Sequence, residues 1–232
     1  MTGGPSSTLR VEVTRIRLGI VSAYLVRGAR TILVDTGLPG QGKRMLNALE
    51  NMGVASELSA IVVTHLHADH AGNAKLLAER LGVPILTPAG GLEYAATGAN
   101  APGMPTTWVA SIVGRLGLVP KRFTPFQPGE VLRDRDRLDA FGVPVQILAT
   151  PGHTDHCISL VCDDGQAILG DVVRGGSRRR ATPLAPLLLD DERGWRSSLG
   201  YLSDVPWSTA HPGHGGLVPR SAFDAFVRRL HC

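Results

Sequence analysis

The chain has 232 residues, of which 43% are hydrophobic and 19% charged. This composition is typical of a globular protein and excludes a disordered chain, a coiled coil and a collagen-like repeat. The formal charge is +4 and aromatic residues make up only 5%, so we expect no nucleic-acid partner. Apolar runs stay below the roughly 18 residues of a membrane span, so we expect no membrane partner either. Three cysteines and a start without a signal-like pattern favour a reduced, cytoplasmic setting.

The first part of the chain is predicted to form three strands and a helix. Apolar and charged residues alternate over residues 9–18, as in a half-buried strand, and further strands are predicted over 21–26 and 31–34. Helical spacing over 40–52 predicts a helix that ends at Gly53.

The next part repeats a strand, a helix and a strand, which is typical of an α/β protein. The strands are predicted over 60–63 and 83–86, with a helix over 71–81 between them. Residues 88–117 have helical character that Gly98, Pro102 and Pro105 interrupt. We interpret them as a helical excursion that covers the cleft on one face of the domain.

The rest of the chain returns to strands and ends in two helices, without a convincing linker, so we expect one domain over residues 1–232. The strands are predicted over 131–138, 143–149, 157–161 and 167–169, a loop over 172–189, and helices over 193–202 and 220–230. Cys157 and Cys162 are five residues apart in one strand-like run. Their side chains should point to opposite faces and should not form a disulfide.

A histidine-rich segment directly follows the strand predicted over 60–63. His65 and His67 are two residues apart, so an extended backbone places both side chains on one side. Asp69 and His70 fall where the next helix starts. Neutral imidazoles and carboxylates are ligands of zinc and similar ions. Asp69 as a helix cap among surface histidines is the simpler alternative, but the spacing favours a metal site.

Further candidate ligands stand at the ends of later strands. His153 follows the strand over 143–149, and Asp171 follows the strand over 167–169. His211 and His214 lie together after a short apolar stretch over 205–210. Taken singly, each is compatible with an ordinary turn or loop. Together they supply the number and type of ligands for two ions.

With these motifs in this order, residues 16–216 resemble the metallo-β-lactamase superfamily. The resemblance implies a four-layer αβ/βα sandwich with two metal ions at the edge of its two sheets. Two zinc ions are the expected cofactors, with iron or manganese as alternatives. The resemblance also implies the ligands of each ion. The first would be held by His65, His67 and His153, the second by Asp69, His70 and His214, and Asp171 would bridge both.

The resemblance also bears on three further residues. Asp35 matches an early aspartate beside the site and is expected to fix the ring of a ligand histidine; a turn residue at a strand end is the alternative. His214, rather than His211, stands in the Pro-Gly-His-Gly pattern of the last motif. His156 occupies a position where many relatives have a small residue. It is a candidate substrate contact, with a hydrogen-bonded surface histidine as the alternative.

Two adjacent ions suit hydrolysis, because they make hydroxide available at neutral pH and polarise a carbonyl or phosphoryl oxygen. No Ser-His-Asp set or Gly-rich phosphate loop competes with this chemistry in the sequence. We therefore expect a metal-dependent hydrolase of an ester, thioester, lactone or amide. Asp69 or Asp171 would carry the proton to the leaving group.

Within the superfamily, the resemblance favours a hydroxyacylglutathione-hydrolase-like (glyoxalase-II-like) or lactonase-like enzyme. True β-lactamases carry Cys or Ser at the position of Asp171, which argues against β-lactamase activity. A mononuclear iron persulfide dioxygenase is the alternative from a redox class, and a non-catalytic binding protein is a third. Iron content and oxygen consumption would separate oxidation from hydrolysis.

The expected partner is a small-molecule substrate, and one arginine suggests that it is anionic. Arg174 lies three residues after Asp171, where the chain leaves the strand end. Its guanidinium would suit a carboxylate or phosphate through parallel hydrogen bonds. A solvated basic loop is the alternative, and it is the favoured interpretation for residues 178–180. The sequence makes no prediction of the oligomeric state.

Overall fold

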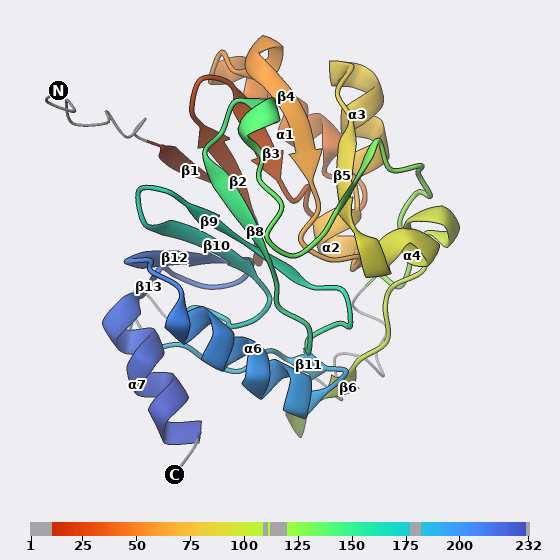
Figure 1. Ribbon diagram of the computed structural model, residues 1–232. Helices are drawn as coiled ribbons and strands as arrows, with labels where there is room; N and C mark the ends of the chain where they lie inside the picture. The colour runs from red at the N-terminus through yellow and green to blue at the C-terminus, as the bar shows by residue number, and fades with distance from the viewer. Residues whose placement is uncertain (1–10, 109–110, 112–119, 177–181, 231–232) are drawn as a thin grey trace, which may run out of the picture.

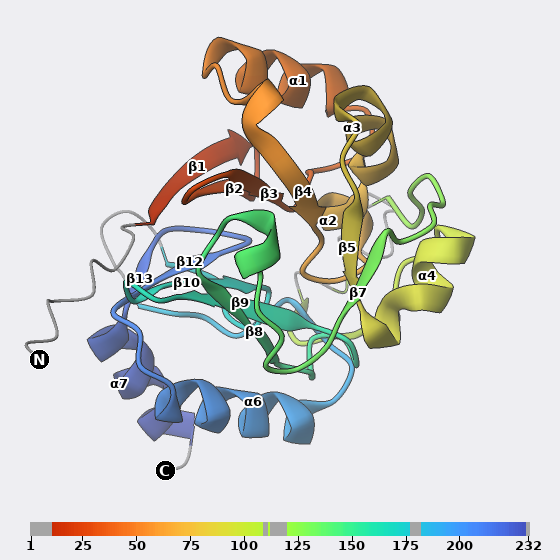
Figure 2. The same cartoon turned by 45° about the horizontal axis from the view of Figure 1, so that its top comes forward.

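Figure 1 shows the protein as a computed structural model that describes residues 11–108, 111, 120–176 and 182–230. Two sheets pack face to face, and helices cover the outer face of each sheet, so the layers follow the order helices, sheet, sheet, helices (Figure 2). The expected α/β class, four-layer sandwich and single domain are therefore confirmed for the described residues.

The first sheet contains six strands in the order β1-β2-β3-β4-β5-β7. The strands are β1 (Glu12–Leu18), β2 (Val21–Arg27), β3 (Thr31–Val34), β4 (Leu58–Val62), β5 (Ile85–Pro88) and β7 (Glu130–Leu132). β1, β2 and β3 pair antiparallel, whereas the pairs from β3 to β7 are parallel. Helices α1 (Gly42–Asn51) and α3 (Ala74–Leu81) connect strands of this sheet and cover its outer face.

The second sheet contains five strands in the order β13-β12-β10-β9-β8. The strands are β8 (Val145–Ala149), β9 (Ile158–Cys162), β10 (Gln166–Gly170), β12 (Thr209–Pro212) and β13 (Val218–Pro219). Its outer face is covered by α6 (Glu192–Asp204) and α7 (Arg220–Leu230). The remaining elements among the described residues are α2 (Ala68–Ala71), α4 (Leu92–Thr97), a two-stranded pair of β6 (Met104–Pro105) with β11 (Leu188–Leu189), and 3₁₀ turns at Ala55–Glu57, Ala89–Gly91 and Asp139–Phe141.

Alternate residues of the central strands serve two different layers of the core. Ile32 and Val34 belong to the cluster between the sheets, whereas Leu33 packs with the residues beneath α1 and α3. In the second sheet, Leu160 faces the first sheet and Val161 packs with the residues beneath α6 and α7. Burial on both faces explains why these strands are apolar without interruption. Each fully buried side chain of this size contributes about 1.5–3 kcal/mol to stability.

Three predicted elements differ from the structure. The loop expected over 172–189 ends in the short strand β11, which pairs with β6. The helix expected over 71–81 is interrupted between α2 and α3. At this break the chain lies against the loop after β3, and a Cβ on Gly72 would be 2.4 Å from the Gly37 carbonyl oxygen. The strand expected over 131–138 ends at Leu132. The Arg133 amide there donates to Asp136 Oδ2 at 2.7 Å, and Arg135 has a φ of 66°, so the charged segment forms a turn.

The prediction for the cysteines is confirmed, and parts of three others fall outside the described residues. Cys157 and Cys162 are buried and free, as expected. In the described part of the chain, no helix has the length and apolar character needed to cross a membrane. The first residues of the strand expected over 9–18, much of the end of the excursion over 88–117, and residues 178–180 lie outside the description.

Candidate metal centre

Four loops at strand ends bring the expected ligands together. The segment after β4 carries His65, His67, Asp69 and His70, and the segment after β8 carries His153. Asp171 directly follows β10, and His214 lies two residues beyond β12. The first segment belongs to one sheet and the other three to its partner sheet. The cluster therefore depends on the packing of the two sheets.

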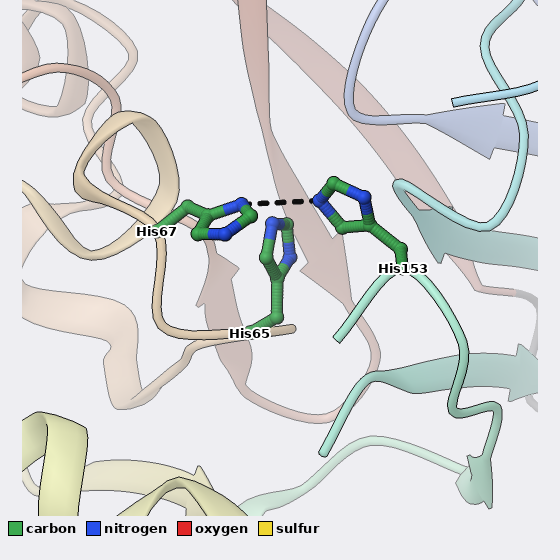
Figure 3. Close-up of side chains that lie close together, drawn as sticks. All are labelled: His65, His67 and His153. Carbon is green, nitrogen blue, oxygen red and sulfur yellow. Dashed lines mark hydrogen bonds between the residues drawn. The ribbon is translucent and has the colours of Figure 1, made fainter. Parts of the chain in front are cut away.

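Three histidines converge in the first group, with one ring nitrogen of each within 4.8 Å of the others. The rings of His67 and His153 flank that of His65, and His67 Nδ1 lies 3.1 Å from His153 Nε2 (Figure 3). The outer nitrogens have carbonyl partners, since His67 Nε2 lies 3.1 Å from the Ala101 oxygen and His153 Nδ1 lies 2.7 Å from the Leu188 oxygen. A carbonyl oxygen can only accept, so each outer nitrogen carries the ring's proton.

The two facing nitrogens of His67 and His153 are therefore both unprotonated. Burial and the neighbouring His153 lower the pKa of His67 to about 3, and burial also lowers the pKa of His153, so neither neutral ring has a second proton. Two lone pairs that face each other at this distance repel unless a cation lies between them. Two nitrogens bound at 2.0–2.1 Å to a tetrahedral zinc lie about 3.3 Å apart. The observed spacing therefore fits a metal ion.

The second group consists of Asp69, His70 and His214, again with ligand atoms within 4.8 Å of one another. Asp69 Oδ2 lies 3.2 Å from His214 Nε2 and 3.8 Å from His70 Nε2. The other nitrogen of His214 donates to the Ile20 carbonyl oxygen at 2.9 Å. Asp69 and His214 are partly exposed, whereas His70 is fully buried.

Asp171 lies between the two groups. Its carboxylate oxygens are 3.6 Å from His153 Nε2, 3.5 Å from His70 Nε2 and 3.3 Å from His214 Nε2. A third set of close ligand atoms joins Asp171 to His65 and His70. This position suits a carboxylate that contacts two ions.

Three buried polar atoms at the centre of this cluster have no hydrogen-bond partner among the described residues. They are His65 Nε2, His70 Nε2 and Asp171 Oδ1, which belong to that third set. A buried polar group without a partner costs about 1–3 kcal/mol. Imidazole nitrogens and a carboxylate oxygen in this arrangement are satisfied by a metal ion, so the residues fit the cofactor that the sequence predicts.

The charges around the cluster favour added positive charge. Burial and the neighbouring His70 keep the pKa of His65 well below its usual range, so its ring is neutral. Burial alone would raise the pKa of Asp171, but His214 and His70 hold it well below its usual range. Burial would lower the pKa of His214, yet Asp171 and Asp69 raise it to about 10. Ionised carboxylates thus attract either protons or a cation into the second group.

Asp35 orients one histidine of the second group. Its Oδ2 lies 2.7 Å from His70 Nδ1, and its Oδ1 accepts from the Thr64 amide at 2.8 Å. Burial alone would lower the pKa of His70, but Asp35, Asp171 and Asp69 raise it above its usual range. Asp35 itself has a φ of 62°, a conformation that few residues other than glycine adopt. The residue thus stands where the sequence comparison placed it, beside a ring of the cluster.

The last motif contributes His214 and not His211 to the cluster. The His211 ring lies edge-on to Tyr24 at 5.3 Å between centroids, and its Nε2 is 3.1 Å from Gln166 Oε1. It is absent from all three sets of close ligand atoms.

His156 and Arg174 differ in how well their positions suit substrate. His156 is 4% exposed, and both of its ring nitrogens have partners, Leu66 and Asp155. This placement argues against the expected substrate contact. Arg174 is half-buried, and its Nε donates to the Ala185 carbonyl oxygen at 2.8 Å. Burial lowers the pKa of Arg174, whereas the charge of Asp171 raises it.

Sequence reasoning missed the backbone groups that orient the rings. The carbonyl oxygens of Ala101, Leu188 and Ile20 each contact one histidine of the cluster. Ala101 belongs to the segment after α4, so the described part of the excursion over 88–117 does reach the site. A carbonyl oxygen has no signature in sequence, because every residue carries one.

Comparison with known proteins agrees with this geometry. Residues 16–214 match the family described as the metallo-beta-lactamase superfamily. The chain is 26% identical over 207 residues to a probable metallo-hydrolase of Methanocaldococcus jannaschii, a match that covers 87% of this chain and 91% of the relative. It is 24% identical over 216 residues to the atrochrysone carboxyl ACP thioesterase of Aspergillus fumigatus, covering 91% of this chain and 41% of that protein.

A solved structure shows the same fold. The archaeal metallo-beta-lactamase superfamily protein of Sulfolobus tokodaii has a TM-score of 0.67 and 20% identity to this chain, covering 95% of this chain and 86% of that one. The chain therefore belongs to the metallo-β-lactamase superfamily, and the resemblance seen in the sequence is confirmed.

Proposed function

We propose that the protein is a dinuclear metal-dependent hydrolase that cleaves an ester, thioester or lactone. The observation that carries this proposal is the pair of unprotonated nitrogens on His67 and His153, with Asp171 beside them and beside the second group. The similarity to a probable metallo-hydrolase supports hydrolysis. The similarity to a protein named as a thioesterase makes a thioester the first bond to test.

Two zinc ions would be held by the residues of the two groups, with Asp171 shared between them. When bound, such ions lower the pKa of a water molecule and polarise the oxygen of the bond to be cleaved. The residues that would hold the first ion are His65, His67 and His153, and those that would hold the second are Asp69, His70 and His214.

The carboxylates of the site would move the proton. Asp69 and Asp171 both have pKa values held low by His70 and His214, so both carboxylates are ionised. The side chain of Asp69 is 15% exposed and that of Asp171 is 9% exposed. Asp69 is therefore better placed to pass a proton to a leaving group that departs towards solvent.

Arg174 would bind an anionic group of the substrate. The hydrogen bond from its Nε to the Ala185 carbonyl oxygen fixes the stem of the side chain, and its pKa is lowered by burial and raised by the charge of Asp171. We therefore propose a small-molecule substrate with a carboxylate or phosphate near the bond that is cleaved.

Metal analysis combined with a hydrolysis assay tests this function. The purified protein should contain about two zinc ions per chain and release thiol from an acyl thioester. His67→Ala should lower zinc affinity and kcat/KM more than about 100-fold, since even outer partners of metal ligands contribute about 10- to 100-fold. The variant should keep its fold, because His67 lies in a loop outside the core clusters.

Several outcomes would contradict the proposal. Wild-type turnover by His67→Ala would show that the site is assigned wrongly. About one iron per chain, with oxygen consumed on a persulfide substrate, would favour the oxidative alternative. Parallel assays with a lactone, a glutathione thioester and a β-lactam distinguish the hydrolytic classes.

A further inference from the structure

One buried histidine outside the candidate ligands connects the two loops on which the first group stands. His156 lies three residues after His153, and its Nε2 accepts a hydrogen bond from the Leu66 amide at 3.1 Å. Leu66 is the residue between His65 and His67. A single side chain thus joins the loop after β4 to the loop after β8.

This hydrogen bond fixes the protonation of the His156 ring. Because the Leu66 N–H donates, Nε2 must be unprotonated, and the neutral ring carries its proton on Nδ1. Nδ1 lies 2.5 Å from Asp155 Oδ1 and donates to it. A carboxylate at this position favours that tautomer, so Asp155 keeps Nε2 available as an acceptor.

The ring is also held by its neighbours. It stacks on Tyr94 of α4, with centroids 5.1 Å apart and an angle of 30° between the planes. On another side it meets Gly91, where an added Cβ would lie 3.2 Å from His156 Cδ2 and 2.4 Å from Leu66 Cδ2. The glycine therefore permits the ring and the Leu66 side chain to pack together.

The two loops need such a connection, because they bring unprotonated nitrogens face to face. His67 Nδ1 and His153 Nε2 are 3.1 Å apart and come from loops that follow strands of different sheets. A second link lies two residues before Leu66, where the Ile158 amide donates to the Thr64 oxygen at 3.0 Å. Two bonds at separate points prevent one loop from turning relative to the other.

We propose that His156 is a positioning residue for the first metal ion, setting the distance between the His65–His67 pair and His153 through its bond to Leu66. The inference rests on the metal centre proposed above. It assigns His156 no contact with substrate or metal. Its effect should be confined to the ion held by His65, His67 and His153, because within the described residues no hydrogen bond or ring contact joins His156 to Asp69, His70 or His214.

Zinc titration against a chelator tests this proposal on the full chain. His156→Leu should raise the dissociation constant of one of the two ions about 10- to 100-fold and leave the other unchanged. His156→Gln should recover most of the affinity, because the amide oxygen of glutamine can accept the Leu66 hydrogen bond. His211→Leu is the matched control, since His211 is equally buried but lies outside the cluster, and it should bind both ions as the wild type does.

Asp155→Asn provides a second variant at an exposed side chain, in case His156→Leu fails to fold. The amide oxygen of asparagine accepts from His156 Nδ1 more weakly than the carboxylate does and favours the tautomer less, so the same ion should bind more weakly by a smaller factor. Unchanged zinc affinity in both His156→Leu and Asp155→Asn would overturn the proposal, as would equal weakening in His211→Leu. A wild-type protein that binds no zinc would instead contradict the metal centre itself.

Discussion

The protonation of the candidate ligands is set by atoms far from them in the chain. The outer ring nitrogens of His67 and His153 donate hydrogen bonds to the carbonyl oxygens of Ala101 and Leu188. The unprotonated nitrogens of both rings therefore point inward. Second partners of this kind orient ligand rings and raise their basicity. The spacing of histidines in the sequence predicted which side chains would meet. It could not predict the tautomers, because the partners are backbone atoms brought in by tertiary packing.

The last motif allows a direct test at the level of single residues. His214→Ala should weaken one zinc ion by more than about 100-fold, because the ring lies 3.2 Å from Asp69 and 3.3 Å from Asp171. His211→Ala should retain both ions, since its partners are Gln166 and Tyr24. Zinc content after dialysis against a weak chelator measures both effects. The reverse pattern would show that His211 is the ligand.

Arg174 should affect only substrates that carry a negative charge. A charge-assisted hydrogen bond contributes about 1.5–3 kcal/mol, so Arg174→Ala should lower kcat/KM on an anionic ester or thioester about 10- to 100-fold. A neutral ester of the same leaving group should be cleaved almost as before. Equal loss on both substrates would point to damage at the metal centre. An unchanged kcat/KM on both substrates would show that Arg174 has only a structural role, through its hydrogen bond to the Ala185 carbonyl oxygen.

At the scale of elements, the apolar pattern predicted most strands but not the close approaches between them. β3 and β9 are buried on both faces, with Leu33 and Val161 packed beneath the helices. An uninterrupted apolar sequence is the expected signature of such strands. The break at Gly72 was not predictable, because it depends on contact with Gly37 from another loop. The early end of β7 was not predictable from periodicity, because it depends on the hydrogen bond from the Arg133 backbone amide to the Asp136 carboxylate.

At the scale of the whole molecule, the two sheets meet through more than apolar packing. Tyr24 of β2 donates to the Pro212 carbonyl oxygen at 2.6 Å, and its ring meets that of His211 in β12. Burial raises the pKa of Tyr24 to about 12, so the phenol stays protonated and keeps this bond at all ordinary pH values. β12 ends at Pro212, two residues before His214.

His211 makes the stability of this contact sensitive to acid. Burial, with a smaller effect of Arg15, lowers the pKa of His211 from 6.5 to about 4. Above pH 6.5 the ring is neutral in the folded and the unfolded chain, so it confers no pH dependence there. Between pH 6.5 and 4 the unfolded chain binds the proton more readily, so stability falls as the pH falls.

The expected loss from this residue is about 2 kcal/mol of unfolding free energy between pH 7.5 and pH 5. Urea denaturation of the wild type and of His211→Leu at the two pH values measures it, since titration of the other histidines is common to both proteins and cancels in the difference. The variant should lose about 2 kcal/mol less than the wild type over this range. Equal losses would mean that His211 titrates alike in the folded and unfolded chain, which its 6% exposure argues against.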